Sequence, residues 1–270
     1  VTKYRINYAV GLHYYKKLNS KFWSRKSQNI NKPIIVLASN WDNYGHFLIE
    51  HLMKLVIINN LSKTLPDKKI VIVVESPCPK WKLDLISIIA NIDYEIFELD
   101  SHVDLIGSTY ISTYPSYNYE LFTTARQTIL SKLQIKNTKE KLKLYISRKL
   151  AKDRKILNED EIIEQLTVQG FTVIYPELLS INEQISLFSN ADTVLGMHGS
   201  GLANIIFCEN VKLIELMPCA KFNTMFFGIS MVLGFKYVSI STSEQTSKGK
   251  DSDAYFDPLT LIKYTKRLDK

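Results

Sequence analysis

The sequence has few cysteines, and their positions exclude a scaffold built on them. Cys78, Cys208 and Cys219 are the only three in 270 residues, and no two of them form a Cys-x-x-Cys pair. An odd number of scattered cysteines predicts neither a disulfide framework nor a zinc site. The composition therefore indicates a globular protein of a reducing compartment, with 46% hydrophobic residues to form its core.

Long apolar runs are also missing from the sequence. No segment stays apolar for the ~20 residues that a membrane-spanning helix needs. The first residues, Val1 to Arg5, contain neither an initiating methionine nor the apolar stretch of a secretory signal. We expect that residues have been trimmed from this end, and a membrane anchor could be among them.

Basic residues outnumber acidic ones but do not gather in one place. The chain has 34 Lys and Arg against 27 Asp and Glu, a net charge of +7. This excess predicts an anionic partner, such as a phosphorylated substrate or a membrane surface that the protein contacts peripherally. The lysines form no stripe interleaved with stacking aromatic side chains, so nucleic acid is not expected as a partner.

Short apolar segments and helical segments alternate along the chain, which predicts an α/β fold with parallel sheets. The alternation stops at a polar, charged linker over residues 135–141 and then starts again. We therefore predict one Rossmann-like domain over residues 1–136 and a second over 137–245. A loop and C-terminal helix over 246–270 are expected to return towards the first domain.

The most informative segment runs from Thr193 to Asn204. An apolar strand stops at His198, a Gly-Ser-Gly turn follows, and Leu202 leads into a helix. The free N–H groups and positive dipole end of a helix start can hold a phosphate. Gly199 and Gly201 would let the backbone approach that phosphate closely. The plain alternative is a strand-to-helix turn with a buried histidine.

Polar residues follow several predicted strands of the second domain. Arg148, Glu177, His198 and Glu215 each lie at or near a carboxyl strand end. Parallel strands bring these ends to one edge of the sheet, where ligands of open α/β sheets bind. The Arg148 fork suits a diphosphate. Glu215 lies within an apolar run, so we expect its carboxylate to accept hydrogen bonds from a specific group, such as a ribose diol.

A second polar cluster follows the first buried strand. A helix is predicted to begin at Asp42 or Asn43, and His46 and Glu50 lie one turn apart on it, away from its apolar face. A carboxylate beside a histidine is a common arrangement for orienting a general base. The alternative is an ordinary surface ion pair.

Several of these motifs occur together in one enzyme family. The first domain contributes Asn43-Tyr44-Gly45-His46-Phe47-Leu48. The second contributes Tyr145-Ile146-Ser147-Arg148, Arg154, Asn158-Glu159, Gly170-Phe171, Pro176-Glu177, Glu183-Gln184, Leu187-Phe188, Ala191-Asp192, His198-Gly199-Ser200-Gly201-Leu202-Ala203-Asn204 and Ile214-Glu215-Leu216. In these residues the chain resembles glycosyltransferase family 61, over roughly residues 33–218. Ser200, which we expect to cap the helix after the turn, stands where the family usually has alanine.

The resemblance implies the GT-B fold, in which two Rossmann-like α/β domains face each other across a cleft. It also implies the inverting transfer of a sugar from a nucleoside-diphosphate donor, usually UDP-linked, to a hydroxyl of a glycan or glycoconjugate acceptor. No metal and no cofactor are expected. We further expect a bacterial type of enzyme that acts in the cytoplasm, in association with the membrane, in surface-polysaccharide synthesis. The alternative location is the secretory lumen, behind a trimmed eukaryotic anchor.

The resemblance also assigns roles to individual residues. His46 is expected to be the catalytic base, oriented by Glu50, with Asp42 as a competing base. Arg148 and the amides of the turn would stabilise the leaving diphosphate, and Glu215 would bind the ribose. The complete set expected to bind the donor is Arg148, Arg154, Glu177, His198, Gly199, Ser200, Gly201, Leu202, Asn204 and Glu215.

Two other functions fit the same features. A GT-B-like epimerase would convert a sugar nucleotide without an acceptor, and a binding module would hold a nucleotide or carbohydrate without turnover. Asp251 and Asp253 have the spacing of metal-binding carboxylates, but they follow no strand, and we expect them in a solvated loop. Donor hydrolysis without acceptor would separate the transferase from the binding module.

Overall fold

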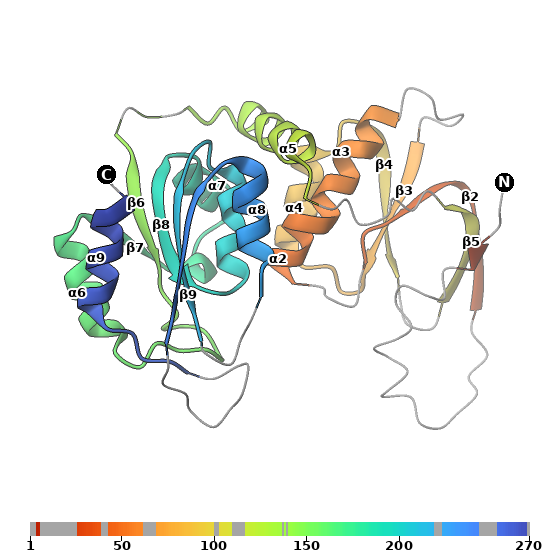
Figure 1. Cartoon of the computed structure of the whole chain (residues 1–270). Helices are drawn as coiled ribbons and strands as arrows, with labels where there is room; N and C mark the ends of the chain where they lie inside the picture. Colours follow the sequence, from red (N-terminus) through yellow and green to blue (C-terminus); the bar gives the residue numbers. More distant parts are fainter. Residues whose placement is uncertain are drawn as a thin grey trace, which may run out of the picture. The chain divides into compact units, whose positions relative to one another are not determined.

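The computed structural model describes residues 4–5, 26–38, 43–61, 69–99, 103–109, 117–136, 138, 140–218, 223–242 and 253–268. It contains two compact units, Val1–Ser116 and Tyr117–Lys270. Each unit has its own five-stranded sheet with helices (Figure 1). The prediction of two Rossmann-like α/β units is therefore confirmed, while the cleft between them stays a prediction.

The first unit is built on a sheet of strand order β1-β5-β2-β3-β4. Its pairings are parallel, except that β1 runs antiparallel to β5. The buried strand β3 reads as a continuous apolar run because neighbours cover both of its faces. The strands are β1 Tyr4–Arg5, β2 Lys26–Val36, β3 Lys69–Glu75, β4 Asp93–Leu99 and β5 Val103–Thr109. The helical segments are α2 Tyr44–His46, η1 Phe47–His51, α3 Leu52–Leu61 and α4 Lys80–Ile89.

Strand β5 differs from the sequence prediction. It ends at Thr109, where the pattern predicts a strand over 109–113 to begin, and the rest of that predicted strand lies outside the described residues. Strand β2 likewise begins at Lys26, well before the apolar run at 34–38 that predicts it. Its buried core residues, Ile34 and Val36, come from its last part, and Ile30 packs against them.

The second unit has a fully parallel sheet of order β10-β9-β8-β6-β7. Helices α6 and α9 lie on one face, and α7 and α8 lie on the other (Figure 1). The 3₁₀ helix η4 contacts both α7 and α8. The strands are β6 Leu142–Ile146, β7 Phe171–Ile174, β8 Ala191–Met197, β9 Lys212–Met217 and β10 Lys236–Ser241. The helices are α5 Tyr119–Lys132, α6 Glu159–Val168, η3 Pro176–Leu178, α7 Ile181–Ser189, η4 Ser200–Phe207, α8 Met225–Leu233 and α9 Pro258–Leu268.

Helix α5 groups with the second unit, so the division between the units falls before the expected boundary at residue 136. Phe122, Ala125 and Ile129 form its buried face, and Arg126 donates a hydrogen bond to the carbonyl oxygen of Cys208. An amphipathic pattern predicts a helix with one covered face, but it does not specify which domain covers that face.

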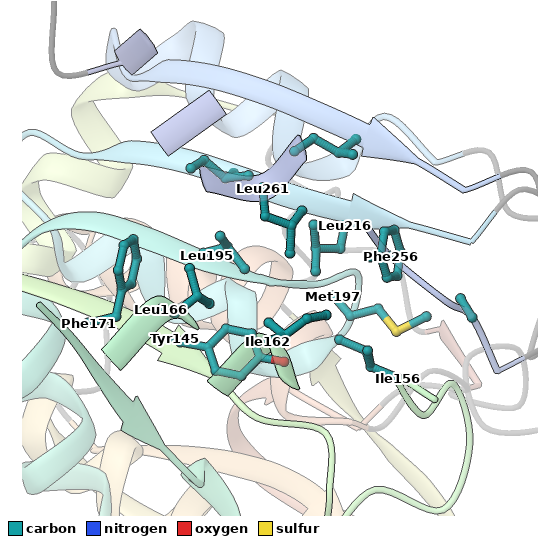
Figure 2. Close-up of a cluster of buried hydrophobic side chains, with 13 residues drawn as sticks. Tyr145, Ile156, Ile162, Leu166, Phe171, Leu195, Met197, Leu216, Phe256 and Leu261 are labelled. Carbon is teal, nitrogen blue, oxygen red and sulfur yellow. The ribbon is translucent and has the colours of Figure 1, made fainter. Parts of the chain in front are cut away.

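The C-terminal helix α9 also packs on the second unit, rather than on the first as the sequence suggested. It lies against α6 and strands β9 and β10. Figure 2 shows its Leu261 in one cluster with Leu216 and Phe256, all of them buried. Each such side chain contributes about 1.5–3 kcal/mol of burial free energy, which fixes α9 to this sheet. None of the helices in the described ranges is long and apolar enough to span a membrane.

Candidate active site

The strand order of the second sheet places a ligand edge between β6 and β8. The chain passes from β6 to β7 in one direction and then returns to β8 on the other side of β6. At such a reversal the connections leave a crevice at the carboxyl ends of the strands. Arg148 follows the end of β6, and His198 follows the end of β8. The structure therefore brings these two predicted residues to the switch point of the sheet.

Two arginine side chains are anchored at this edge by backbone carbonyl groups. Arg148 donates from Nη2 to the carbonyl oxygen of Asp153 at 2.6 Å and from Nε to that of Arg154 at 3.3 Å. Arg154 donates from Nη1 to the carbonyl oxygen of His198 at 2.7 Å. Because carbonyl oxygens carry only partial charge, these bonds orient the guanidinium groups without neutralising them.

The Arg148 guanidinium lies directly against the turn after β8. A Cβ atom built on Gly199 would lie 3.2 Å from Arg148 Nη1, so the absence of a side chain at Gly199 permits the close approach. Burial, followed by the positive charge of Arg154, lowers the pKa of Arg148, while Glu177 opposes this shift. Glu177 itself is exposed in η3, at the end of the neighbouring strand β7. The edge thus holds two oriented guanidinium groups, with the carboxylates of Glu177, Glu159 and Asp153 near enough to Arg148 to oppose the lowering of its pKa.

The turn itself differs from the prediction in two respects. The segment after it is the 3₁₀ helix η4, whose N-cap is Gly199, and no side chain caps it. Ser200 is its first residue, so it does not act as the cap. The Leu202 amide donates to the Gly199 carbonyl oxygen at 3.0 Å and is therefore used within the helix rather than left for a phosphate. Gly199, Ser200 and Gly201 still precede the first helical bond at this edge.

Asn204 lies inside the protein rather than at the ligand edge. Its side chain is fully buried, and Nδ2 donates to Gln184 Oε1 at 2.9 Å and to the Gly201 carbonyl oxygen at 3.1 Å. Gln184 in turn donates from Nε2 to the carbonyl oxygen of Pro176 at 3.0 Å. The predicted role in donor binding is therefore replaced by a structural one, in which Asn204 ties the turn to α7.

We predict that Asn204→Ala lowers the free energy of unfolding by about 1–3 kcal/mol, because it leaves buried polar groups without a partner. The measurement is urea unfolding followed by circular dichroism, in a double-mutant cycle with Gln184→Ala. A coupling energy of roughly 0.5 kcal/mol or more is expected for two side chains in direct contact. Strictly additive losses would show that the two amides do not stabilise one another.

Glu215 is likewise not available to a ribose. It lies in the middle of β9, its side chain is fully buried, and both carboxylate oxygens have partners within the protein. Oε1 is 2.5 Å from Nδ1 of His198, and Oε2 accepts a hydrogen bond from the Tyr237 hydroxyl at 2.6 Å. The carboxylate in the apolar run is therefore satisfied internally, which corrects the predicted ribose contact.

A second buried carboxylate, that of Glu159, fixes the backbone at Arg148, where the loop between β6 and α6 that carries both arginines begins. Glu159 Oε1 accepts hydrogen bonds from the Tyr145 hydroxyl at 2.9 Å and from the backbone amide of Arg148 at 2.7 Å. Glu159 is the first residue of α6, where a negative charge also complements the helix dipole. The sequence motif contains this residue, but its role depends on a contact between two elements that spacing does not reveal.

In the first unit, the structure brings His46 and Glu50 together. Asn43 caps the helix, because its Oδ1 accepts a hydrogen bond from the His46 amide at 3.1 Å. His46 Nδ1 lies 2.8 Å from Glu50 Oε1, and about a quarter of each side chain is exposed. The carboxylate thereby orients the ring and leaves Nε2 as its basic nitrogen. Asp42, the competing base, lies outside the described residues.

The helix that carries this pair is not a regular α-helix. Residues Phe47–His51 form a π-helical segment between α2 and α3, in which the Leu52 amide donates to the Phe47 carbonyl oxygen. Such bulges occur mostly as single turns within α-helices, and often at functional sites. Hydrophobic periodicity does not distinguish this segment from an ordinary helix, so the sequence does not predict it.

Near the His46–Glu50 pair lie the buried basic side chains of His51, Lys54 and Lys82, whose grouping no sequence pattern indicates. Lys82 has no exposed side-chain area, and its Nζ lies 2.5 Å from Glu75 Oε1 and 5.3 Å from the centre of the Phe47 ring. Burial, and then the charges of Lys54 and Lys82, lowers the pKa of His51 from 6.5 to about 3. His51 is therefore neutral in the folded protein at neutral pH.

Asp251 and Asp253 have the spacing of a metal-binding pair. The structure describes Asp253, and its surroundings are not those of a metal site. Asp253 Oδ1 accepts a hydrogen bond from the backbone amide of Lys155 at 2.8 Å, whereas Asp251 lies outside the described residues. Within the ranges that the structure covers, no group of three or more His, Cys, Asp and Glu side chains is placed to hold a metal ion.

The fold is that of a Rossmann-like α/β protein. Its polar residues Arg148 and His198 lie at the switch point, on the carboxyl edge of the second sheet. A family model for glycosyltransferase 61 matches residues 44–214. Because this match spans more than half of the sequence, the chain belongs to glycosyltransferase family 61. The matched span contains the His46–Glu50 pair, both arginines and the turn at His198.

Curated relatives match part of the chain. The EGF domain-specific O-linked N-acetylglucosamine transferase of Drosophila melanogaster is 36% identical over 109 residues, which are 38% of this chain and 21% of that protein. The alpha-1,3-arabinosyltransferase XAT3 of Oryza sativa subsp. japonica is 27% identical over 122 residues, covering 40% and 21% of the two proteins. The match thus spans about a fifth of each of these two relatives.

Solved structures resemble the chain more distantly. The heptosyltransferase WaaC of E. coli with ADP is 9% identical, with a TM-score of 0.47 over 89% of this chain and 97% of that one. The glycosyl transferase family 9 protein of Veillonella parvula is 7% identical, with a TM-score of 0.45 over 92% of both chains.

Proposed function

We propose that this chain is an inverting glycosyltransferase that moves a sugar from a nucleoside-diphosphate donor, UDP-linked, to a hydroxyl of a glycan or glycoconjugate. The observation that carries this proposal is the pair of arginine side chains held against the turn at the switch point of the second sheet. Membership of family 61 and the transferase names of the matched relatives agree with it.

The second unit would bind the donor. Arg148 and Arg154 present cationic forks that carbonyl groups orient but do not neutralise. A diphosphate placed here gains charge when its bond to the sugar breaks, and preorganised donors stabilise that charge without reorganising. Glu177, exposed at the end of the neighbouring strand, is proposed to contact the base or the sugar.

The first unit would supply the base. In the proposed step, the acceptor oxygen forms a bond to the anomeric carbon, and the bond from that carbon to the diphosphate breaks with its electron pair leaving on the diphosphate. The acceptor proton passes to Nε2 of His46, whose Nδ1 is paired with Glu50. One displacement of this kind inverts the anomeric configuration. We propose that it proceeds without a metal or a cofactor.

The proposed setting is the synthesis of surface polysaccharide in the cytoplasm, with the basic protein in peripheral contact with the membrane. Two other functions can be tested in the same assay. An epimerase would convert the sugar nucleotide in the absence of acceptor, and a binding module would hold it without turnover. Incubating the chain with UDP-sugars, with and without glycan acceptors, separates the three by their products.

The test of the donor site is UDP binding measured by calorimetry, with and without EDTA. We expect binding that EDTA does not change and that Arg148→Lys weakens at least tenfold, because lysine keeps the charge but loses the bidentate fork. Arg267→Lys is the matched control, since Arg267 is exposed in the last turn of α9. Circular dichroism confirms that each variant is folded.

Two results would overturn this proposal in different ways. If Arg148→Lys binds UDP as tightly as Arg267→Lys and the wild type, UDP is attracted by general positive charge, which both variants keep, rather than by the geometry of the Arg148 guanidinium. If neither UDP nor other nucleoside diphosphates bind, with or without a divalent cation, the donor claim fails while the fold stands.

A further inference from the structure

Three hydrogen-bonded side chains lie behind the turn of the proposed donor site. We propose that Glu215 and Tyr237 are positioning residues, which hold the His198 ring so that its Nε2 atom is presented to the donor diphosphate. This inference rests on the function proposed above. It gives Glu215 a role other than ribose binding, and it adds Tyr237, which no motif in the sequence indicates.

The carboxylate at the centre of this arrangement is fully buried and has one partner on each oxygen. Oε1 faces Nδ1 of His198 at 2.5 Å, and Oε2 accepts from the Tyr237 hydroxyl at 2.6 Å. A buried carboxylate is costly unless it is paired and hydrogen-bonded. Strands β8, β9 and β10, which lie side by side, bring the three residues together. The arrangement is thus part of the sheet rather than of a loop.

The carboxylate determines which nitrogen of His198 is left for a ligand. An ionised carboxylate only accepts hydrogen bonds, so the Nδ1 atom that faces it carries the hydrogen. Nε2 has no hydrogen-bond partner among the described residues, and it is the nitrogen that remains for a donor molecule. In the protonated ring, Nε2–H donates to a diphosphate oxygen while the Glu215 carboxylate balances the charge of the imidazolium.

Helix α8 holds both ends of the arrangement with two consecutive aromatic residues. The Phe226 ring lies 5.3 Å from the His198 ring, and the Phe227 ring lies 5.5 Å from that of Tyr237, both measured between ring centres. Burial, followed by the bond to Glu215, raises the pKa of Tyr237, so its hydroxyl remains a donor at neutral pH. The geometry therefore leaves the His198 ring little freedom to turn.

The direct test is nuclear magnetic resonance of the full chain labelled with ¹⁵N-histidine, with UDP as the ligand. The His198 signals are assigned with His198→Gln. We expect Tyr237→Phe to shift the Nδ1 signal of His198 in the ligand-free protein, and we expect saturating UDP to shift the Nε2 signal of the wild type. Tyr264→Phe is the matched control, because Tyr264 packs on the opposite face of the same sheet.

Turnover gives a second readout that a merely structural role would not produce. Tyr237→Phe is expected to lower kcat about tenfold, the order of one lost hydrogen bond in the transition state. The KM for the donor should stay within twofold, since the arginines remain in place. Tyr264→Phe should change neither value.

The outcomes separate this inference from the function on which it rests. If calorimetry shows that UDP binds but the Nε2 signal of His198 does not move, the inference is overturned and the donor site stands. Unchanged Nδ1 signals in Tyr237→Phe would overturn it as well, because the hydroxyl then does not position the ring. If no nucleoside diphosphate binds at all, calorimetry shows that the proposed function has failed, and the inference falls with it.

Discussion

Replacing His46 by alanine is expected to lower kcat by about 10²–10⁴-fold, the range typical of a lost general base. UDP binding should be unchanged, because the proposed donor site is formed by the second unit. Folding should be unchanged too, since the His46 side chain is partly exposed and lies outside the buried core. The measurements are initial rates at saturating donor and acceptor, and UDP calorimetry on the same variant.

Glu50→Gln serves as the companion variant for this prediction. The amide can still orient the ring, but it supplies no charge to the imidazolium, so we expect a smaller loss of kcat than in His46→Ala. If His46→Ala keeps nearly full turnover, the base has been assigned to the wrong residue. Asp42→Asn would then be the decisive variant, because Asp42 is the competing base.

Acidification is expected to destabilise the first unit through His51. The unfolded chain takes up a proton on this residue below its ordinary pKa of 6.5, whereas the buried ring in the folded protein takes it up only near pH 3. Between these values the unfolded state holds more protons, so the free energy of unfolding falls as the pH falls. The slope from this one group is about 1.4 kcal/mol per pH unit.

His51→Leu should remove that contribution, because an apolar side chain has no proton to bind. The measurement is urea unfolding at several pH values between 5 and 6.5, followed by tryptophan fluorescence, since all three tryptophans fall in the first unit. Met53→Leu, a volume-conserving change on the same helix, is the control that should keep the wild-type slope. Identical slopes in His51→Leu and the wild type would contradict the prediction.

The sequence predicts the fold well wherever burial determines composition. Parallel strands covered on both faces need apolar residues throughout, so β3, β8 and β9 can be recognised as runs. The His46–Glu50 contact also follows from spacing, because residues four apart on a helix lie one above the other. Residues at strand ends, such as Arg148 and His198, are located once the strands are known.

What the sequence could not predict depends on partners from distant elements. A carboxylate in an apolar run must be satisfied, but the pattern does not say whether a ligand or a neighbouring strand satisfies it, and Glu215 has His198 and Tyr237. Asn204 in the motif reads as a ligand contact, although it binds Gln184 inside the protein. The positions of helices α5 and α9 could not be predicted for the same reason. An amphipathic pattern predicts that one face is buried, but it does not specify which unit buries it.

The π-helical segment at Phe47–His51 has a consequence for insertions and deletions at this point of the chain. It accommodates one residue more than an α-helical turn would, so the sequence before it is offset by one residue from the helical repeat after it. Deleting one residue here would restore a continuous α-helix and leave His46 facing nearly the same way relative to α3, because the π-helical turn completes about the same rotation with one more residue. The buried face of α3 and the direction of His46 are thus kept together, since this one segment absorbs the difference in register.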